Sequence, residues 1–258
     1  MRNYLFYVLG LLLFASCSKE EVDNRESIDF YYLPRPCELM EINHACRQDM
    51  GKETGESDMD GVYYVNDNVE ESVKVEDYLF RVDVGNINSE IVSDPDYSLE
   101  DYLGEHDVDM EKELDRYLEK KVDGTLKSGR LKSSSEVYAI MAGIEYRTDE
   151  VKRLEVISDV ELFGVVAGSS LNGYVELFSA PQYHSFLFSH NKQLIGSIER
   201  GWSLEKYMSV RPLAAASLYL RFKSVPEETP VKAKIIVEME LANGKVLRSE
   251  SDAVNLLP

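Results

Sequence analysis

Hydrophobic and polar residues alternate most regularly near the C-terminal end of the chain. From Val231 to Leu241 apolar side chains fall at every second position, as in a β-strand with one buried face. Asn243-Gly244 follows, a dipeptide that favours a type I′ turn, and residues 245–251 can return as the antiparallel partner. This segment therefore predicts a β-hairpin.

Other short apolar and aromatic runs, separated by Gly, Pro and Asn, also predict strands. The stretch from Cys37 to Asp49 is interpreted as a loop or one helical turn, and 137–146, apolar on both faces, as a central strand. The pattern as a whole predicts a mainly β fold over residues 28–258, an immunoglobulin-like antiparallel β-sandwich with a short helical insertion. The remaining expected strands are 28–33, 62–65, 77–84, 153–163, 174–178, 183–188 and 213–222.

The period changes to that of a helix within an acidic insertion at about 94–135. Ser98 and Asp101 suit the start of a short helix over 99–103. A longer helix is predicted from apolar residues on one face, with Asp109 as its cap and Gly124 at its end. The residues of that face are Met110, Leu114, Tyr117, Leu118 and Val122.

The first 16 residues have the pattern of a cleaved signal peptide. Arg2 supplies a positive charge, and residues 4–15 are almost entirely apolar. A membrane-spanning helix needs about 20 apolar residues, and this run stops earlier, at Cys17 and the charged residues after it.

The segment Phe14-Ala15-Ser16-Cys17 resembles a bacterial lipobox, which implies that Cys17 is acylated and becomes the mature N-terminus. Acyl chains on Cys17 would anchor the protein without a spanning helix. The alternative is a plain secretory signal with an incidental cysteine. Residues 18–21 resemble the acidic signal that sends Bacteroidota lipoproteins to the cell surface, or they are simply part of a polar tether over 17–27.

The strand pattern of residues 217–256, with 151–164, resembles a family of Bacteroidota lipoproteins of unknown function. The resemblance covers about half of the mature chain and includes no chemical motif. It implies a β-sandwich in a surface or periplasmic lipoprotein, and it implies no activity.

The charge of the chain is strongly negative. Without the leader, which contains one basic residue, 27 basic and 47 acidic side chains remain, a net charge of −20. Such a surface repels phosphate backbones and argues against nucleic acid as a partner. Residues 17–136 contain 14 basic and 32 acidic residues, so this half meets cations or is a solvated outward face.

No residue pattern points to a particular reaction. The chain lacks a Gly-x-Ser-x-Gly elbow, a His-Glu-x-x-His motif, a Cys-x-x-Cys motif and a phosphate-binding glycine loop. A hydrolase with dispersed residues stays open as the weakest alternative. The four histidines are scattered; His184 and His190 could share a sheet end and a metal, although ordinary surface histidines are the simpler interpretation.

The acidic stretches do not match a known calcium loop. One acidic stretch contains Asp58 and Asp60. The other, 107–111, is explained more simply as carboxylates that favour a helix N-terminus. No metal or cofactor is expected. Cys37 and Cys46 can form a disulfide in an oxidising compartment or remain two thiols.

Trp202 is the one candidate for a ligand platform, either exposed on a loop or buried as a plug of the sandwich. The sequence thus predicts a non-enzymatic protein, lipid-anchored at the outer membrane and exposed at the cell surface. Its expected partners are the membrane, through the lipid, and a protein or a glycan. A glycan-binding accessory lipoprotein using Trp202 is the alternative function.

Overall fold

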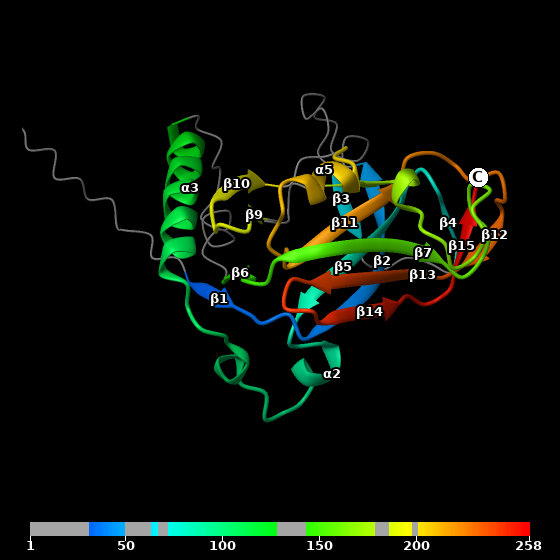
Figure 1. Cartoon of the computed structure of the whole chain (residues 1–258). Helices are drawn as coiled ribbons and strands as arrows, with labels where there is room; N and C mark the ends of the chain where they lie inside the picture. The colour runs from blue at the N-terminus through cyan, green and yellow to red at the C-terminus, as the bar shows by residue number, and fades with distance from the viewer. Residues whose placement is uncertain (1–30, 50–62, 67–71, 128–142, 179–185, 198–200) are drawn as a thin grey trace, which may run out of the picture.

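The structure is a computed structural model that describes residues 31–49, 63–66, 72–127, 143–178, 186–197 and 201–258. This part of the chain is mainly β (Figure 1). The strands are β1 (Tyr32–Pro34), β2 (Leu39–Asp49), β3 (Tyr63–Asn66), β4 (Ser72–Lys74), β5 (Tyr78–Gly85), β6 (Ile144–Tyr146), β7 (Val151–Ser158), β8 (Val175–Leu177), β9 (Phe186–Phe188), β10 (Leu194–Ser197), β11 (Ser217–Phe222), β12 (Val231–Ala233), β13 (Ile235–Leu241), β14 (Val246–Glu250) and β15 (Val254–Leu257). The helices are α2 (Ser89–Val92), α3 (Val108–Lys127) and α5 (Leu204–Ser209), with the 3-10 helices η2 (Leu99–Tyr102) and η3 (Asn172–Tyr174).

Two antiparallel sheets enclose the main core. One has five strands in the order β3-β2-β5-β11-β8, and the other has three in the order β14-β13-β7. Alternation decides which side chains enter the core: Phe80, Val82 and Val84 of β5 are buried there, while Arg81 and Asp83 point to the other face. Residues of β7 and β13 complete the same cluster, so the two sheets pack face to face.

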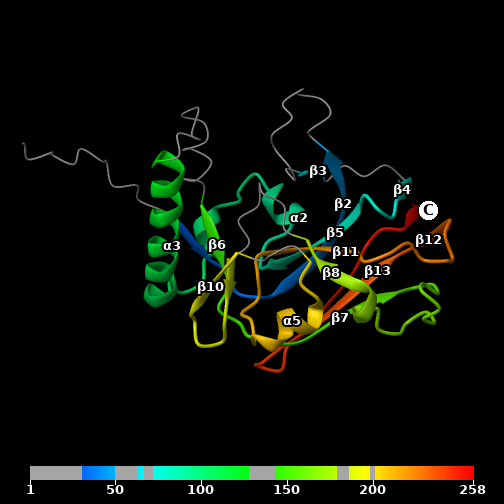
Figure 2. The same ribbon diagram turned by 90° about the horizontal axis from the view of Figure 1, so that it is seen from above.

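A third sheet, β12-β15-β4, lies at the end of the molecule where the C-terminus is found (Figures 1 and 2). Here the predicted strand from Val231 to Leu241 divides into β12 and β13, which belong to different sheets. The division falls at Lys234, whose backbone N–H donates to Asp159 Oδ1 (2.7 Å). The strands are also not all antiparallel, since β15 pairs with β4, and β1 with β6, in parallel.

The predicted C-terminal hairpin is confirmed, but its turn type is not. β13 and β14 pair antiparallel from Ile236 to Glu240. Gly244 has a positive φ of 86°, whereas Asn243 does not, and a type I′ turn needs both. The Gly244 N–H donates to Leu241 O and the Leu241 N–H to Lys245 O, both at 2.9 Å. This is a three-residue loop that ends in a glycine bulge.

The segment from Cys37 to Asp49, expected as a loop or helical turn, instead forms the long strand β2 beside β5. Met40 and Ile42 face the core, but His44 and Gln48 follow in the same alternation, so the apolar pattern is too short to identify the strand from the sequence. Cys37 and Cys46 are not joined in a disulfide. The seven residue steps of extended strand from Leu39 to Cys46 alone span about 23 Å, far beyond disulfide reach.

A smaller apolar cluster lies beneath α3, which stands at the opposite end of the molecule from the C-terminus (Figures 1 and 2). Met110, Leu114 and Leu118 of the predicted helical face are buried against β6 and β9. The helix begins one residue after Asp107, and Asp107, rather than Asp109, accepts from the Met110 N–H (3.2 Å).

Two further expectations change in this region. The short predicted helix after Ser98 is the 3-10 helix η2. The predicted central strand at 137–146 is described only from 143, and there β6 pairs with β1 in a two-stranded sheet rather than at the centre of a large one.

Replacing Gly244 with alanine should destabilise the protein by about 1 to 2 kcal/mol, because a side chain disfavours the left-handed backbone of the turn. Gly173→Ala is the matched control. A Cβ would meet nothing within 4 Å at either position, but only Gly244 has a positive φ. Urea unfolding would measure both changes, and equal destabilisation would contradict the assigned turn.

Candidate functional site

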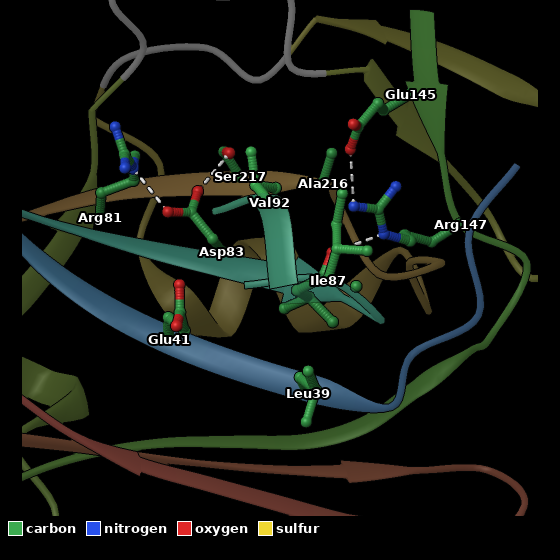
Figure 3. A pocket seen from close by; sticks show the side chains of 12 residues that line it. Leu39, Glu41, Arg81, Asp83, Ile87, Val92, Glu145, Arg147, Ala216 and Ser217 are labelled. Carbon is green, nitrogen blue, oxygen red and sulfur yellow. Dashed lines mark hydrogen bonds and ion pairs between the residues drawn. The ribbon is translucent and has the colours of Figure 1, made fainter. Parts of the chain in front are cut away.

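A half-open pocket of about 300 Å³ lies on the outer face of the five-stranded sheet (Figure 3). Its floor is formed where the start of β2, the end of β5 and the start of β11 meet, and the segment around α2 and the end of β6 supply its walls. Twelve residues line it: Leu39, Glu41, Arg81, Asp83, Val84, Gly85, Ile87, Val92, Glu145, Arg147, Ala216 and Ser217.

Strand register places Glu41, Asp83 and Ser217 in one row across the floor. Asp83 lies opposite Glu41 of β2 on one side and opposite Ser217 of β11 on the other. Asp83 accepts from Arg81 Nε (2.6 Å), Asn43 Nδ2 (3.1 Å) and Ser217 Oγ (2.5 Å). Both of its carboxylate oxygens are therefore occupied by internal donors.

Glu41 differs from its neighbours in the row. Its half-buried carboxylate has no hydrogen bond or ion pair with any residue that the structure describes, and Figure 3 shows it projecting from β2 apart from the bonded groups. Burial raises the pKa of Glu41 above its ordinary value, and the charge of Asp83 raises it further, while Arg81 acts in the opposite direction. The pocket thus contains one carboxylate with no hydrogen bond or ion pair to a described residue, and the nearby Arg81 is bonded to Asp83 instead.

The wall beside β6 is held by two buried arginines that share one carboxylate. Arg35 Nε donates to Glu145 Oε1 (3.0 Å), and Arg147 Nη2 donates to Glu145 Oε2 (2.9 Å). The arginine side chains are only 1% and 3% exposed. Arg147 Nε also donates to the backbone oxygen of Val84 at the end of β5 (2.5 Å). These bonds tie β6 to the five-stranded sheet.

Gly85 allows this arrangement. A Cβ at Gly85 would lie 3.0 Å from Arg147 Nη2, so the absence of a side chain lets the guanidinium lie against the strand end. The neighbouring Glu38 N–H donates to the Gly85 oxygen (2.8 Å), which closes the same end of the sheet.

The lining combines charged and apolar side chains. It contains no histidine or cysteine, and its serine donates to Asp83. Leu39 and Val92 are 37% and 52% exposed and give the pocket an apolar rim. A small ligand can therefore meet both an apolar surface and an ionised group.

The sequence-predicted site residues do not gather at this pocket. Cys17 lies outside the described residues. Trp202 is half-buried against the main core, and Lys206 Nζ lies 4.0 Å from the centre of its ring. The backbone oxygen of Trp202 accepts from the Leu177 N–H (2.7 Å), which fixes the loop to β8. The ring is thus partly covered on the side of Lys206.

No group of metal-ligating side chains occurs among the residues whose placement is described. Asp58, Asp60 and His184 lie outside them. In the other acidic stretch Asp107 pairs with Lys192 (2.5 Å), and Glu111 accepts from the Tyr146 hydroxyl (2.8 Å). These carboxylates support the start of α3.

Sequence reasoning missed Glu41 and the arginine pair. Burial of the arginines could have been inferred from the sequence, because Arg35 and Arg147 each follow closely after an apolar run predicted to be a strand. For Glu41 none existed, since its isolation depends on which strands become neighbours.

Comparisons with protein-family models, curated protein sequences and solved structures find no match. Across the parts of the chain with described coordinates, no helix is both long and apolar enough to cross a bilayer.

Replacing Glu145 with alanine should lower the free energy of unfolding by roughly 3 kcal/mol, because two buried guanidinium groups would lose their counter-charge. Glu240→Ala removes a carboxylate from a solvent-facing ion pair with Lys152 and should cost several-fold less. Urea unfolding of both variants would measure the difference. Equal losses would show that the arginine pair is not a structural tie.

Replacing Glu41 with glutamine should stabilise the protein at pH 7. The pKa of Glu41 is raised in the folded state, so its ionisation opposes folding above that pKa. The stabilisation should be constant at neutral pH, shrink as the pH falls through the folded pKa and vanish below the unfolded one. Thermal unfolding between pH 3 and pH 7, about the range of glutamate titration, would measure it.

Glu250→Gln is the control for this comparison. The pKa of Glu250 is lowered by its hydrogen bond with Lys234 (2.5 Å), so its removal should not stabilise the protein at pH 7. A wild-type protein more stable than Glu41→Gln at pH 7 would contradict the isolation of Glu41.

Proposed function

We propose that this chain is a lipid-anchored, non-enzymatic binding protein of the cell envelope, which binds a small ligand or a partner's side chain in the pocket on the five-stranded sheet. The observation that carries the binding part is Glu41, a half-buried carboxylate without an internal partner in an open pocket. Partial burial of a charge without a partner costs free energy, and a pocket carboxylate whose pKa is raised by burial and a neighbouring charge is a candidate for a functional site.

The anchoring part rests on the N-terminal sequence. An apolar leader, small residues, Cys17 and an abrupt charged flank occur in the order that lipoprotein processing requires. Acylation of Cys17 would leave residues 18–27 as a polar tether between the lipid and the folded body. The segment Ser18-Lys19-Glu20-Glu21, with its two glutamates, supports placement on the outer face of the outer membrane.

An immunoglobulin-like topology belongs to the same proposal. Its support is the pair of antiparallel sheets around one core, and the parallel pairs of β1 with β6 and β15 with β4 are departures from that pattern. A glycan-binding function would need an aromatic platform, and no aromatic residue lines the pocket. Binding at a charged pocket is therefore the function we propose.

Metabolic labelling with radioactive palmitate tests the anchor. Label should enter the wild-type protein and be lost in Cys17→Ala, which should also leave the membrane fraction, because two or more acyl chains are needed for stable attachment. Ser18→Ala, one residue away, should keep both label and membrane association. Label that persists in Cys17→Ala would disprove anchoring at that residue.

A further inference from the structure

The charges of the pocket do not balance within its lining. Three carboxylates, Glu41, Asp83 and Glu145, face two guanidinium groups, Arg81 and Arg147. One negative charge is therefore in excess among these five groups, while Arg35, which lies outside the lining, supplies a third guanidinium to Glu145 alone. An excess charge in a partly desolvated site favours a ligand of the opposite sign.

The excess is located at Glu41, because every other charged group of the lining is already paired. Asp83 holds Arg81, and Glu145 holds Arg147 together with Arg35, which does not line the pocket. The nearest carboxylate, Asp83, is poorly placed to share a metal ion with Glu41, since three internal donors already use most of its lone pairs. Calcium needs six to eight oxygen ligands, and this row offers it one carboxylate.

An anionic ligand is also disfavoured. Arg147 is the lining cation at the β6 wall; its side chain is 3% exposed, and its guanidinium already donates to Glu145, Val84 and Tyr146. The other lining cation, Arg81, is 21% exposed and is held by Asp83. An anion would therefore have to compete with these carboxylates and would be repelled by Glu41.

The apolar part of the pocket indicates what the cation is attached to. Leu39 opposes Gly85 in the row next to Glu41 and Asp83, so the apolar rim begins beside the unpaired carboxylate. Leu39 and Val92 remain exposed, and Ile87 lines the same wall. An aliphatic stem lying on these side chains would remove them from water while its charged end reached Glu41.

We propose that the pocket binds a primary ammonium or guanidinium group on an aliphatic stem, with Glu41 as the acceptor of its hydrogen bonds. This inference rests on the proposed function and names its ligand class. A charge-assisted hydrogen bond to Glu41 would supply the specificity, and the apolar rim would supply contact area. The same group occurs in free amines and in lysine or arginine side chains of a protein.

Titration of the full chain, labelled at its methyl groups, with n-pentylamine tests the proposal by NMR. The Ile87 and Val92 signals should shift to saturation, and pentylamine should bind about tenfold or more tightly than 1-pentanol, the difference expected of one charged hydrogen bond. Glu41→Gln should remove that advantage. Glu250→Gln, which deletes the same charge far from the pocket, should keep it.

The remaining outcomes distinguish binding in the pocket from a preference of the pocket for cations. If 1-pentanol or hexanoate binds as tightly as pentylamine, or if Glu41→Gln leaves the amine affinity unchanged, the cation inference fails while pocket binding stands. If no probe shifts the Ile87 and Val92 signals, both fail. The acylation of Cys17 is tested separately and is unaffected by either result.

A comparison of pentylamine with N-acetyl-lysine methylamide distinguishes the source of the ligand. The lysine derivative presents the same ammonium from a peptide backbone. Tighter binding of the peptide-like probe would assign the pocket to a side chain of a protein partner, and tighter binding of pentylamine would assign it to a free amine. Failure of both to bind would overturn the proposal.

Discussion

The shared carboxylate of Glu145 holds the part of the structure on which the pocket depends. Two guanidinium groups, Arg35 and Arg147, are almost completely buried on it, and neither could remain so without a counter-charge. Arg147 also bonds the end of β5, while the Arg35 N–H donates to Tyr146 O of β6 (3.1 Å). The pair of strands β1 and β6 is thereby fixed against the end of β5, and the β6 side forms one wall of the pocket.

This arrangement explains why one group in the pocket is left unpaired. Arg147 is turned toward Glu145, and Arg81 toward Asp83, so neither cation is directed to Glu41. The ionised Glu41 then costs stability, as binding sites often do. The three-stranded sheet shows the opposite behaviour: on β13 the outward Glu238 and Glu240 both meet basic side chains. The simplest explanation for a carboxylate that the described part of the fold leaves unpaired is that a bound molecule supplies its positive partner.

Much of the fold could be predicted from local pattern, and the exceptions have physical causes. The alternation of 231–241 and the single apolar face of α3 predicted a strand and a helix, and the structure confirms the helix and, over 235–241, the strand β13. β2 was missed because His44 and Gln48 fall at positions that alternate with Met40 and Ile42. His44 is accommodated by hydrogen bonds to Tyr78 (2.9 Å) and to Asp252 far along the chain (2.8 Å). The candidate site could not be predicted, because its row of Glu41, Asp83 and Ser217 is created by the pairing of strands more than 130 residues apart.

The protonation of Glu41 is the most direct test of this account. Carboxyl carbon chemical shifts, followed by NMR from pH 3 to pH 8 without and with pentylamine, would give the pKa of this one group in the intact protein, against an ordinary value of about 4.3. The account predicts a pKa above the ordinary value without amine and a fall when the amine binds, since a cation favours the ionised form. A pKa at or below the ordinary value, unchanged by the amine, would contradict it.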